Sequence, residues 1–326
     1  MMKILLAVLA TFIIIIVIAL SYVKLALPDV GAAESITVEL SPERISRGEY
    51  LFKHRMACAV CHSSRDWTKY AGPVVPETLG KGGQQFSEKK GLPGNFTAKN
   101  LTPYHLKDWT DGELFRAITL GVSKDGRPLF PIMPYENYRQ LDREDIYDVI
   151  AYIRTLNSIE NDVAESEPAG PMNFIIHLIP QATEMNAKEP DHASLEAFGK
   201  YLTLSASCNH CHTPMQDGQY IEEMAFAGGF EFPLESGGIV RSSNITPDLQ
   251  TGIGKWSQEQ FIKRFKQYDD SNYVSGDIQA NTFNTEMPWI AYSKMDTVEL
   301  KAIYTYLKSL KAVNNQIVRF SPGRTQ

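Results

Sequence analysis

The chain has 326 residues, of which 43% are hydrophobic and 21% are charged, a composition typical of globular domains and long enough for two of them. Its 38 acidic residues outnumber its 32 basic residues, which gives a formal net charge of −6. We therefore expect no nucleic acid as a partner, because phosphate binding needs clustered Lys and Arg.

The first predicted element is a membrane-spanning helix at the N-terminus. Residues 4–20 are apolar apart from Thr11, and the run extends to about 20 residues, the length at which a helix can cross a bilayer. Lys3 precedes the run and Lys24 follows it. We therefore predict a transmembrane anchor over residues 1–26.

A cleaved signal peptide is the alternative explanation of this apolar run. The small residues at 30–33 are compatible with a cleavage site, and cleavage after Ala33 would make the rest of the chain soluble. Because the core of a signal peptide is usually shorter, about 7–15 residues, we favour an uncleaved anchor followed by a linker over residues 27–40.

The four cysteines of the chain fall into two motifs of the form Cys-x-x-Cys-His. They are Cys58, Cys61 and His62, and then Cys208, Cys211 and His212. This pattern is typical of c-type haem, in which both thiols bond to the haem and the histidine becomes an axial ligand of its iron. The alternatives are a redox disulfide and a zinc site, which would have to gather ligands from both motifs. We expect two covalently bound haem c groups, each with an iron.

Helical signals surround the first motif. Ser41 before a proline predicts the start of a helix that leads into the motif. Thr110 opens a capping box, and Asp142 caps a helix with apolar residues at i, i+3 or i+4, and i+7. Since no strand-like alternation of useful length is visible, we predict a small all-α domain over residues 41–157, with long loops that pack on the haem.

The features of this unit recur in the same order further along the chain. The recurring pairs are Gly48 and Gly199, Gly82 and Gly228, Asn100 and Asn244, Trp109 and Trp256, and Met133 and Met287. Helix caps also recur, at Ser257 and Asp296. Duplication explains this order, so we predict a second all-α domain over residues 191–312. Residues 158–190 are then a linker that packs on the domains, and residues 313–326 are a tail.

Each iron needs a ligand on the face opposite its histidine. Of the ten methionines and seven histidines, only Met133 and Met287 are followed by proline, which favours an extended conformation and lets a loop present the side chain. Both lie at equivalent positions of the repeat. We therefore predict that His62 and Met133 ligate one iron and that His212 and Met287 ligate the other, with His105 as the rival ligand.

Three further motifs occur in each unit. The first unit has Asn100-Leu101-Thr102-Pro103, Asp108-Trp109-Thr110-Asp111 and Met133-Pro134-Tyr135, and the second has Asn244-Ile245-Thr246-Pro247, Lys255-Trp256-Ser257 and Met287-Pro288-Trp289. These motifs resemble the haem domains in the cytochrome c subunits of membrane-bound alcohol and gluconate dehydrogenases. The resemblance implies tandem cytochrome c domains, each with one His/Met haem, that relay electrons from a dehydrogenase toward the respiratory chain. Those subunits typically carry three such domains, whereas this chain has two.

Two six-coordinate irons would leave no open position for a substrate, which favours electron transfer between protein partners. We therefore predict a membrane-anchored dihaem cytochrome c, not an enzyme, between a respiratory donor (a dehydrogenase or quinol-oxidising complex) and a cytochrome or terminal oxidase. Haem attachment takes place outside the cytoplasmic membrane, so we expect the haem domains on its periplasmic side. The alternatives are a dihaem enzyme, such as a peroxidase, and a fixed subunit of a larger respiratory complex.

Overall fold

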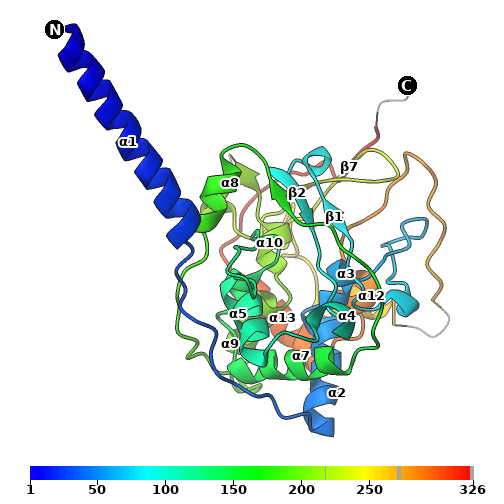
Figure 1. The fold of residues 1–326 in the computed structure, drawn as a ribbon. Helices are drawn as coiled ribbons and strands as arrows, with labels where there is room; N and C mark the ends of the chain where they lie inside the picture. The colour runs from blue at the N-terminus through cyan, green and yellow to red at the C-terminus, as the bar shows by residue number, and fades with distance from the viewer. Residues whose placement is uncertain (217, 270–272, 324–326) are drawn as a thin grey trace.

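The structure, a computed structural model, describes residues 1–216, 218–269 and 273–323. The other positions lie outside the described residues: 217 and 270–272 in the predicted second domain, and 324–326 in the predicted tail. One long helix, α1 (Met2–Ala26), projects from a body of shorter helices and loops (Figure 1). No residue of α1 is buried, and the helix is long and apolar enough to cross a membrane.

The first unit consists of helices joined by long loops. Its main helices are α2 (Pro42–Tyr50), which continues into the π-helical turn η1 (Leu51–Arg55), α3 (Cys58–His62), α5 (Asp111–Leu120) and α7 (Arg143–Thr155). Shorter turns are η2 (Pro76–Thr78), η3 (Glu88–Lys90), α4 (Pro103–Leu106) and α6 (Tyr135–Tyr138). The first and last of the main helices, α2 and α7, pack against each other.

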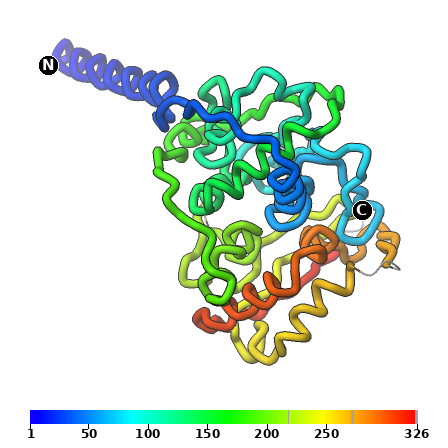
Figure 2. Tube along the Cα trace, turned by 90° about the horizontal axis from the view of Figure 1, so that it is seen from below, coloured from blue at the N-terminus to red at the C-terminus, as the bar shows by residue number. Residues whose placement is uncertain are grey.

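The second unit repeats this order after the predicted linker. The linker contains β3 (Glu167–Pro168), α8 (Met172–Ile175) and η4 (Ile176–Leu178). The unit itself contains α9 (Leu195–Ser205), α10 (Cys208–His212), η5 (Glu222–Met224), α11 (Gln258–Lys266), α12 (Trp289–Tyr292) and α13 (Thr297–Ser309). Helix α9 packs on α13 as α2 packs on α7, and Figure 2 shows the two units side by side.

The predicted helix caps are confirmed in both units. The side chains of Ser41 and Asp142 accept hydrogen bonds from backbone NH groups in the first turns of α2 and α7. Thr110, Ser257 and Asp296 each form a complete capping box at the start of α5, α11 and α13. Each cap satisfies NH groups that have no partner within the helix, so these helix starts are fixed by local sequence.

Short strands in the loops correct the predicted all-α fold. In the first unit β1 (Gln85–Phe86), β2 (Gly94–Thr97) and the linker strand β3 form an antiparallel sheet. In the second, β6 (Glu231–Pro233), β7 (Ile239–Arg241) and β8 (Phe320–Ser321) form another, and β4 (Met215–Gln216) pairs with β5 (Gln219–Tyr220). Strands of two to four residues are too short for alternation to be visible in a sequence. The fold is therefore mostly helical, with small sheets that hold the linker and the tail against the loops.

A glycine allows the first and last helices of each unit to cross closely. A Cβ atom on Gly48 of α2 would lie 1.8 Å from the backbone oxygen of Asp148 in α7. In the second unit, a Cβ atom on Gly199 of α9 would lie 2.0 Å from the backbone oxygen of Ala302 in α13. The recurrence of this glycine in the sequence therefore reflects one helix crossing that is present twice.

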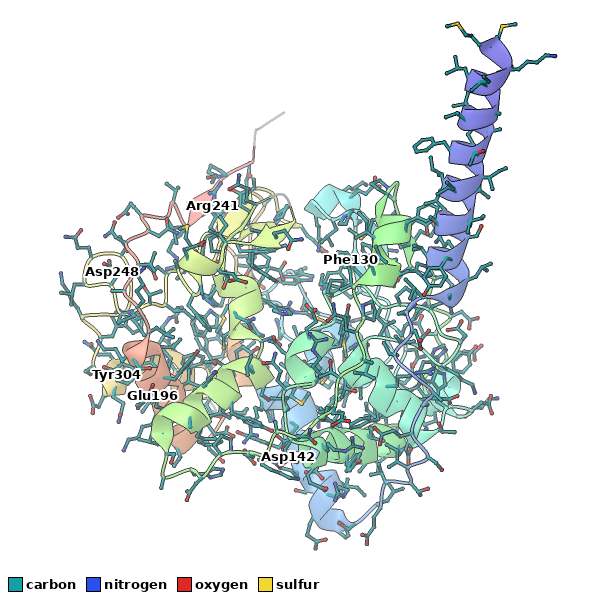
Figure 3. The ribbon with its side chains drawn as sticks, turned by 90° about the vertical axis from the view of Figure 1, so that its left-hand side faces the viewer. Phe130, Asp142, Glu196, Arg241, Asp248 and Tyr304 are labelled. Atoms are coloured by element: carbon teal, nitrogen blue, oxygen red, sulfur yellow. The ribbon has the colours of Figure 1, made fainter. Side chains whose placement is uncertain are left out.

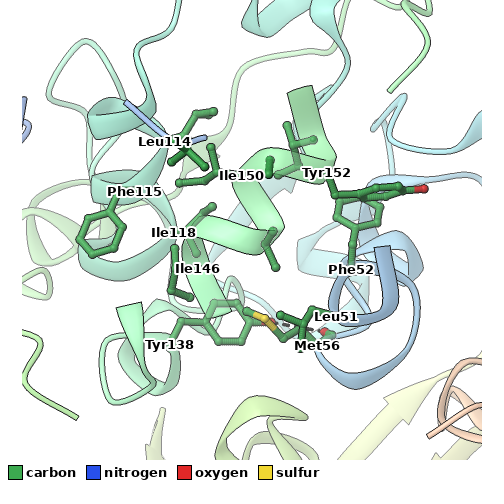
Figure 4. Close-up of a cluster of buried hydrophobic side chains, with 14 of the residues drawn as sticks. Leu51, Phe52, Met56, Leu114, Phe115, Ile118, Tyr138, Ile146, Ile150 and Tyr152 are labelled. Atoms are coloured by element: carbon green, nitrogen blue, oxygen red, sulfur yellow. Dashed lines mark hydrogen bonds between the residues drawn. The ribbon is translucent and has the colours of Figure 1, made fainter. Parts of the chain in front are cut away.

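The two units have separate hydrophobic cores that nevertheless share residues. The first core includes the fully buried Leu51 and Ile150 (Figure 4), and the second includes the fully buried Phe198. Tyr201, from the second unit, belongs to the first core, and Ala57, from the first unit, belongs to the second. Because each unit completes the core of the other, the two form one body.

Substituting Gly48→Ala or Gly199→Ala should destabilise the protein by about 1–3 kcal/mol, because the added methyl group overlaps a backbone carbonyl. The preference of a helix for Ala over Gly offsets this loss by no more than about 1 kcal/mol. Urea unfolding followed by circular dichroism measures the change. Gly276→Ala is the control, since a Cβ there meets nothing within 4 Å, and equal stability of all three variants would contradict the crossing.

Candidate haem-binding sites

Each Cys-x-x-Cys-His motif forms a short helix of its own. Helix α3 follows Ala57 and helix α10 follows Ser207, and both preceding residues have left-handed backbone conformations with φ near 51°. This conformation is uncommon for residues other than glycine, so its presence in both units marks a shared turn into the motif. Helical spacing then places the two cysteines and the histidine, at i, i+3 and i+4, on one face.

A hydrogen bond fixes the ring of each motif histidine. His62 Nδ1 lies 2.8 Å from the backbone oxygen of Lys99, and His212 Nδ1 lies 2.7 Å from that of Ser243. Since a carbonyl oxygen only accepts, Nδ1 carries the proton and Nε2 keeps its lone pair for a metal. Burial lowers the pKa of both histidines, so both rings are neutral, the form that binds iron.

The loop that supplies this carbonyl is held by the Asn-x-Thr-Pro motif. Asn100 Oδ1 accepts from the NH of Thr102 at 2.8 Å, and Asn100 Nδ2 donates to the backbone oxygen of Ile159 at 2.9 Å. In the second unit, Asn244 Oδ1 accepts from the NH of Thr246 at 2.9 Å. Its Nδ2 donates to the backbone oxygen of Val313, just after α13, at 2.8 Å. The motif therefore ties the histidine-binding loop to the end of its unit.

A glycine brings this loop against the motif helix in both units. The NH of Gly82 donates to the backbone oxygen of His62 at 2.9 Å, and that of Gly228 donates to His212 at 2.7 Å. Both glycines have positive φ, and a Cβ on either would lie within 2.6 Å of the backbone of the carbonyl-supplying loop. Only glycine fits here without displacing that loop.

The surroundings of the four cysteines favour thiols over thiolates. Burial raises the pKa of Cys58 to about 12, of Cys61 to about 11, and of Cys208 and Cys211 to about 12. In the part of the chain that the structure describes, no group of three or more His, Cys, Asp or Glu side chains could hold a metal ion. Together with the neutral histidines, these sites fit covalent haem.

The two predicted methionine ligands lie in the same local turn. Met133 packs against the first core and Met287 against the second. In each case the methionine oxygen accepts the NH two residues further on, at 2.8 Å. Pro134 and Pro288 occupy the middle of these turns, with φ near −80° and ψ of 47° and 62°, close to an inverse γ-turn. Each methionine thus belongs to the unit of its predicted histidine partner.

The remaining candidates lie in other surroundings. His105, the rival ligand, is exposed, with its ring 6.2 Å from that of Trp109. His210, between the two cysteines of the second motif, stacks on Tyr220 with ring centres 5.7 Å apart.

The two motifs approach each other across the boundary between the units. Asn137 of α6 donates to Asn209, inside the second motif, at 2.8 Å. Burial and then the Cys61 thiol of the first motif raise the pKa of Cys211. Helix α6 of the first unit packs on α9 of the second, and α12 packs on η1 in return. The two attachment sites are therefore neighbours at the boundary between the units.

Two helices of the form Cys-x-x-Cys-His, each with a neutral histidine beside two thiols, define a protein that attaches haem covalently at two sites. The cytochrome c family model matches residues 45–157 and 197–311. The chain therefore belongs to the cytochrome c family, and it carries two covalently bound haem c groups.

Three relatives indicate the branch of this family. The fructose dehydrogenase cytochrome subunit of Gluconobacter japonicus is 27% identical over 280 residues, which cover 82% of this chain and 53% of that subunit. The cytochrome c subunit of alcohol dehydrogenase (quinone) from Gluconobacter oxydans is 25% identical over 293 residues, covering 82% and 55%. A diheme cytochrome c-type protein of Cereibacter sphaeroides is 26% identical over 280 residues, covering 82% and 86%. The chain spans about half the length of the first two relatives, and the three together show an electron-transfer cytochrome.

A cluster of tyrosine and acidic side chains between the units is not among the predicted site residues. Tyr50 of α2 donates to Glu299 of α13, and Tyr201 of α9 donates to Asp145 of α7 at 2.7 Å. Each tyrosine oxygen also accepts the backbone NH of the cap residue of that partner helix, at 3.1 and 3.0 Å. Each unit thus binds the start of the other's last helix in the same way.

Arg55 lies at the centre of this cluster and is only 1% exposed. Its Nε lies 2.8 Å from Glu299, and its Nη1 lies 3.2 Å from Asp145 and 2.9 Å from Glu189 of the linker. The first unit has one residue more between this tyrosine and the first motif cysteine than the second unit has. The π-helical turn η1, which contains Arg55, lies in that interval. This difference in spacing is the signal that could have revealed the cluster.

Substituting Arg55→Met should destabilise the protein by roughly 3–5 kcal/mol, because Glu299 would stay buried without a positive partner and Asp145 would keep only its partly exposed ion pair with Arg47. Chemical unfolding of the haem-loaded protein measures the loss. Arg127→Met is the matched control: its ion pairs with Asp125 and Glu165 are more than half exposed, so its loss should stay below about 1 kcal/mol.

A second variant separates charge from packing. Adding Asp145→Asn and Glu299→Gln to Arg55→Met removes the unpaired charges and should restore part of the lost stability. If the single and triple variants were equally unstable, the charge cluster would not be what binds the two units.

Proposed function

We propose that this chain is a membrane-anchored dihaem cytochrome c that carries electrons from a dehydrogenase or quinol-oxidising complex to a cytochrome or terminal oxidase. The observation that carries the proposal is the close approach of the two units at their attachment sites, where Asn137 in α6 of the first unit bonds to Asn209 inside the second motif. The haems supply one-electron exchange when bound. Two attachment sites in units that share their cores keep donor and acceptor close within the chain.

The proposed ligands give the chain a carrier's chemistry. His62 and His212, with Nδ1 protonated by their backbone hydrogen bonds, offer Nε2 to the iron. Met133 and Met287 are the proposed second ligands, so that neither iron offers a position to a substrate. A methionine ligand also raises the haem potential, which suits transfer toward a high-potential acceptor.

The names of the relatives support a dehydrogenase as the donor, because two of them are described as cytochrome subunits of fructose and alcohol dehydrogenases. The proposed location is the outer face of the cytoplasmic membrane, with α1 as the anchor. The length and apolar character of α1 support this location, and its flanking lysines suit the two membrane surfaces.

Substituting Met133→Ala or Met287→Ala should leave both haems attached and lower the potential of one haem by on the order of 0.1 V, out of the roughly 0.8 V that axial ligands span. Redox titration followed by optical spectroscopy measures the shift. Met185→Ala and Met295→Ala, which remove buried core methionines of the two units, are the matched controls and should leave both potentials unchanged. Unchanged potentials in the first pair would exclude these methionines as ligands.

Purification in mild detergent tests the proposed partner. The tagged full-length chain should bring down a membrane-bound dehydrogenase, and addition of that enzyme's substrate should reduce both haems. Copurification that persists through several columns would indicate a fixed subunit, whereas loss of the enzyme with retained reduction would indicate a mobile carrier. Rapid turnover of peroxide by the half-reduced chain alone would overturn the carrier proposal in favour of an enzyme.

A further inference from the structure

The segment between the two units contains an apolar stretch that the electron-transfer function does not use. Residues 172–179 read Met-Asn-Phe-Ile-Ile-His-Leu-Ile and lie between Pro171 and Pro180. Ile176 is buried and fixes the stretch to the body, whereas Ile175 and Leu178 are 44% and 53% exposed.

This stretch is bound to the end of α1. Lys24, in the last turn of α1, donates to Asn173 at 2.6 Å, and its ammonium lies 5.1 Å from the centre of the Phe174 ring. His177 lies 2.7 Å from the backbone oxygen of Leu27, directly beyond the helix. Figure 1 shows α8 beside the end of α1 that is nearest the body. If α1 crosses a membrane, residues 172–179 therefore lie at the depth at which α1 leaves the hydrocarbon layer.

The length of α1 sets the depth of this level in a membrane. Its 25 residues span about 37 Å at 1.5 Å per residue, against about 30 Å of hydrocarbon. The long apolar run of α1 is first interrupted by a charge at Lys24, and a lysine at such a position extends its ammonium to the headgroup layer. Asn173 and His177, which contact this lysine or the residues after it, lie in the same layer.

We propose that residues 172–179 form a second membrane contact, in which Ile175 and Leu178 enter the boundary between lipid headgroups and acyl chains beside α1. This inference rests on the membrane anchoring in the proposed function. Apolar side chains that reach 5–10 Å below the surface are typical of interfacial segments. With α1 alone, the haem domains would be held to the membrane at one point. A second contact fixes their orientation toward the lipid surface.

Site-directed spin labelling of the full-length haem-loaded chain in vesicles of phosphatidylcholine and phosphatidylglycerol tests the proposal. The four native cysteines are bonded to haem, so a new cysteine is the only free thiol. Ile175→Cys and Leu178→Cys report on the proposed contact. Leu249→Cys is the matched control, because Leu249 is also exposed, at 62%, and its neighbour Asp248 lies on the side of the body far from α1 (Figure 3). Val17→Cys reports on the anchor itself.

Power saturation by oxygen and by a water-soluble nickel complex measures the depth of each label. Labels at 175 and 178 should favour oxygen over nickel several-fold more than the label at 249, and less than the label at 17. If the label at 17 is buried while 175, 178 and 249 are equally open to nickel, the second contact is wrong and the anchor stands. If the label at 17 is itself open to nickel, the membrane anchoring fails and the contact fails with it.

Discussion

The bond between a histidine Nδ1 and a backbone carbonyl is the constraint on which each haem site depends. It fixes the tautomer of His62 and of His212, and it requires the carbonyl-supplying loop to reach the motif helix. That approach explains why a glycine with positive φ recurs at 82 and 228, and why an Asn-x-Thr motif secures the same loop in both units. Much of the loop sequence is therefore determined by the orientation of one ring.

A second constraint acts between the units and concerns their spacing. The two cores exchange residues, and the tyrosine bonds run from each unit to the last helix of the other. Arg55 adds one positive charge among three carboxylates at this boundary. Such a boundary resists sliding, because any displacement would separate buried charges from their partners. Electron transfer depends on distance, so a boundary of this kind suits a chain with two haems.

Features that depend on neighbouring residues could be predicted from the sequence, whereas contacts between residues far apart in the chain could not. The helix starts, such as that at Thr110, depend on residues within one turn and are confirmed. The attachment residues follow from the motif itself, whereas Met133 and Met287 as iron ligands remain a prediction that rests on their repeat positions. The short strands carry no visible pattern. The contacts of Arg55 join residues up to 244 positions apart, which no local periodicity can indicate.

The reciprocal bonds of Tyr50 and Tyr201 also bear on the origin of the chain. In a two-fold symmetric dimer with an isologous interface, the same surface of each subunit contacts the equivalent surface of the other. The bonds of Tyr50 and Tyr201 follow this pattern. Joining the two copies of such a homodimer through a linker would leave this arrangement. The present halves are not equivalent, because the first has one more residue before its motif and places Arg55 at their shared boundary. The chain therefore has two distinguishable haem sites where a symmetric dimer would have two equal ones.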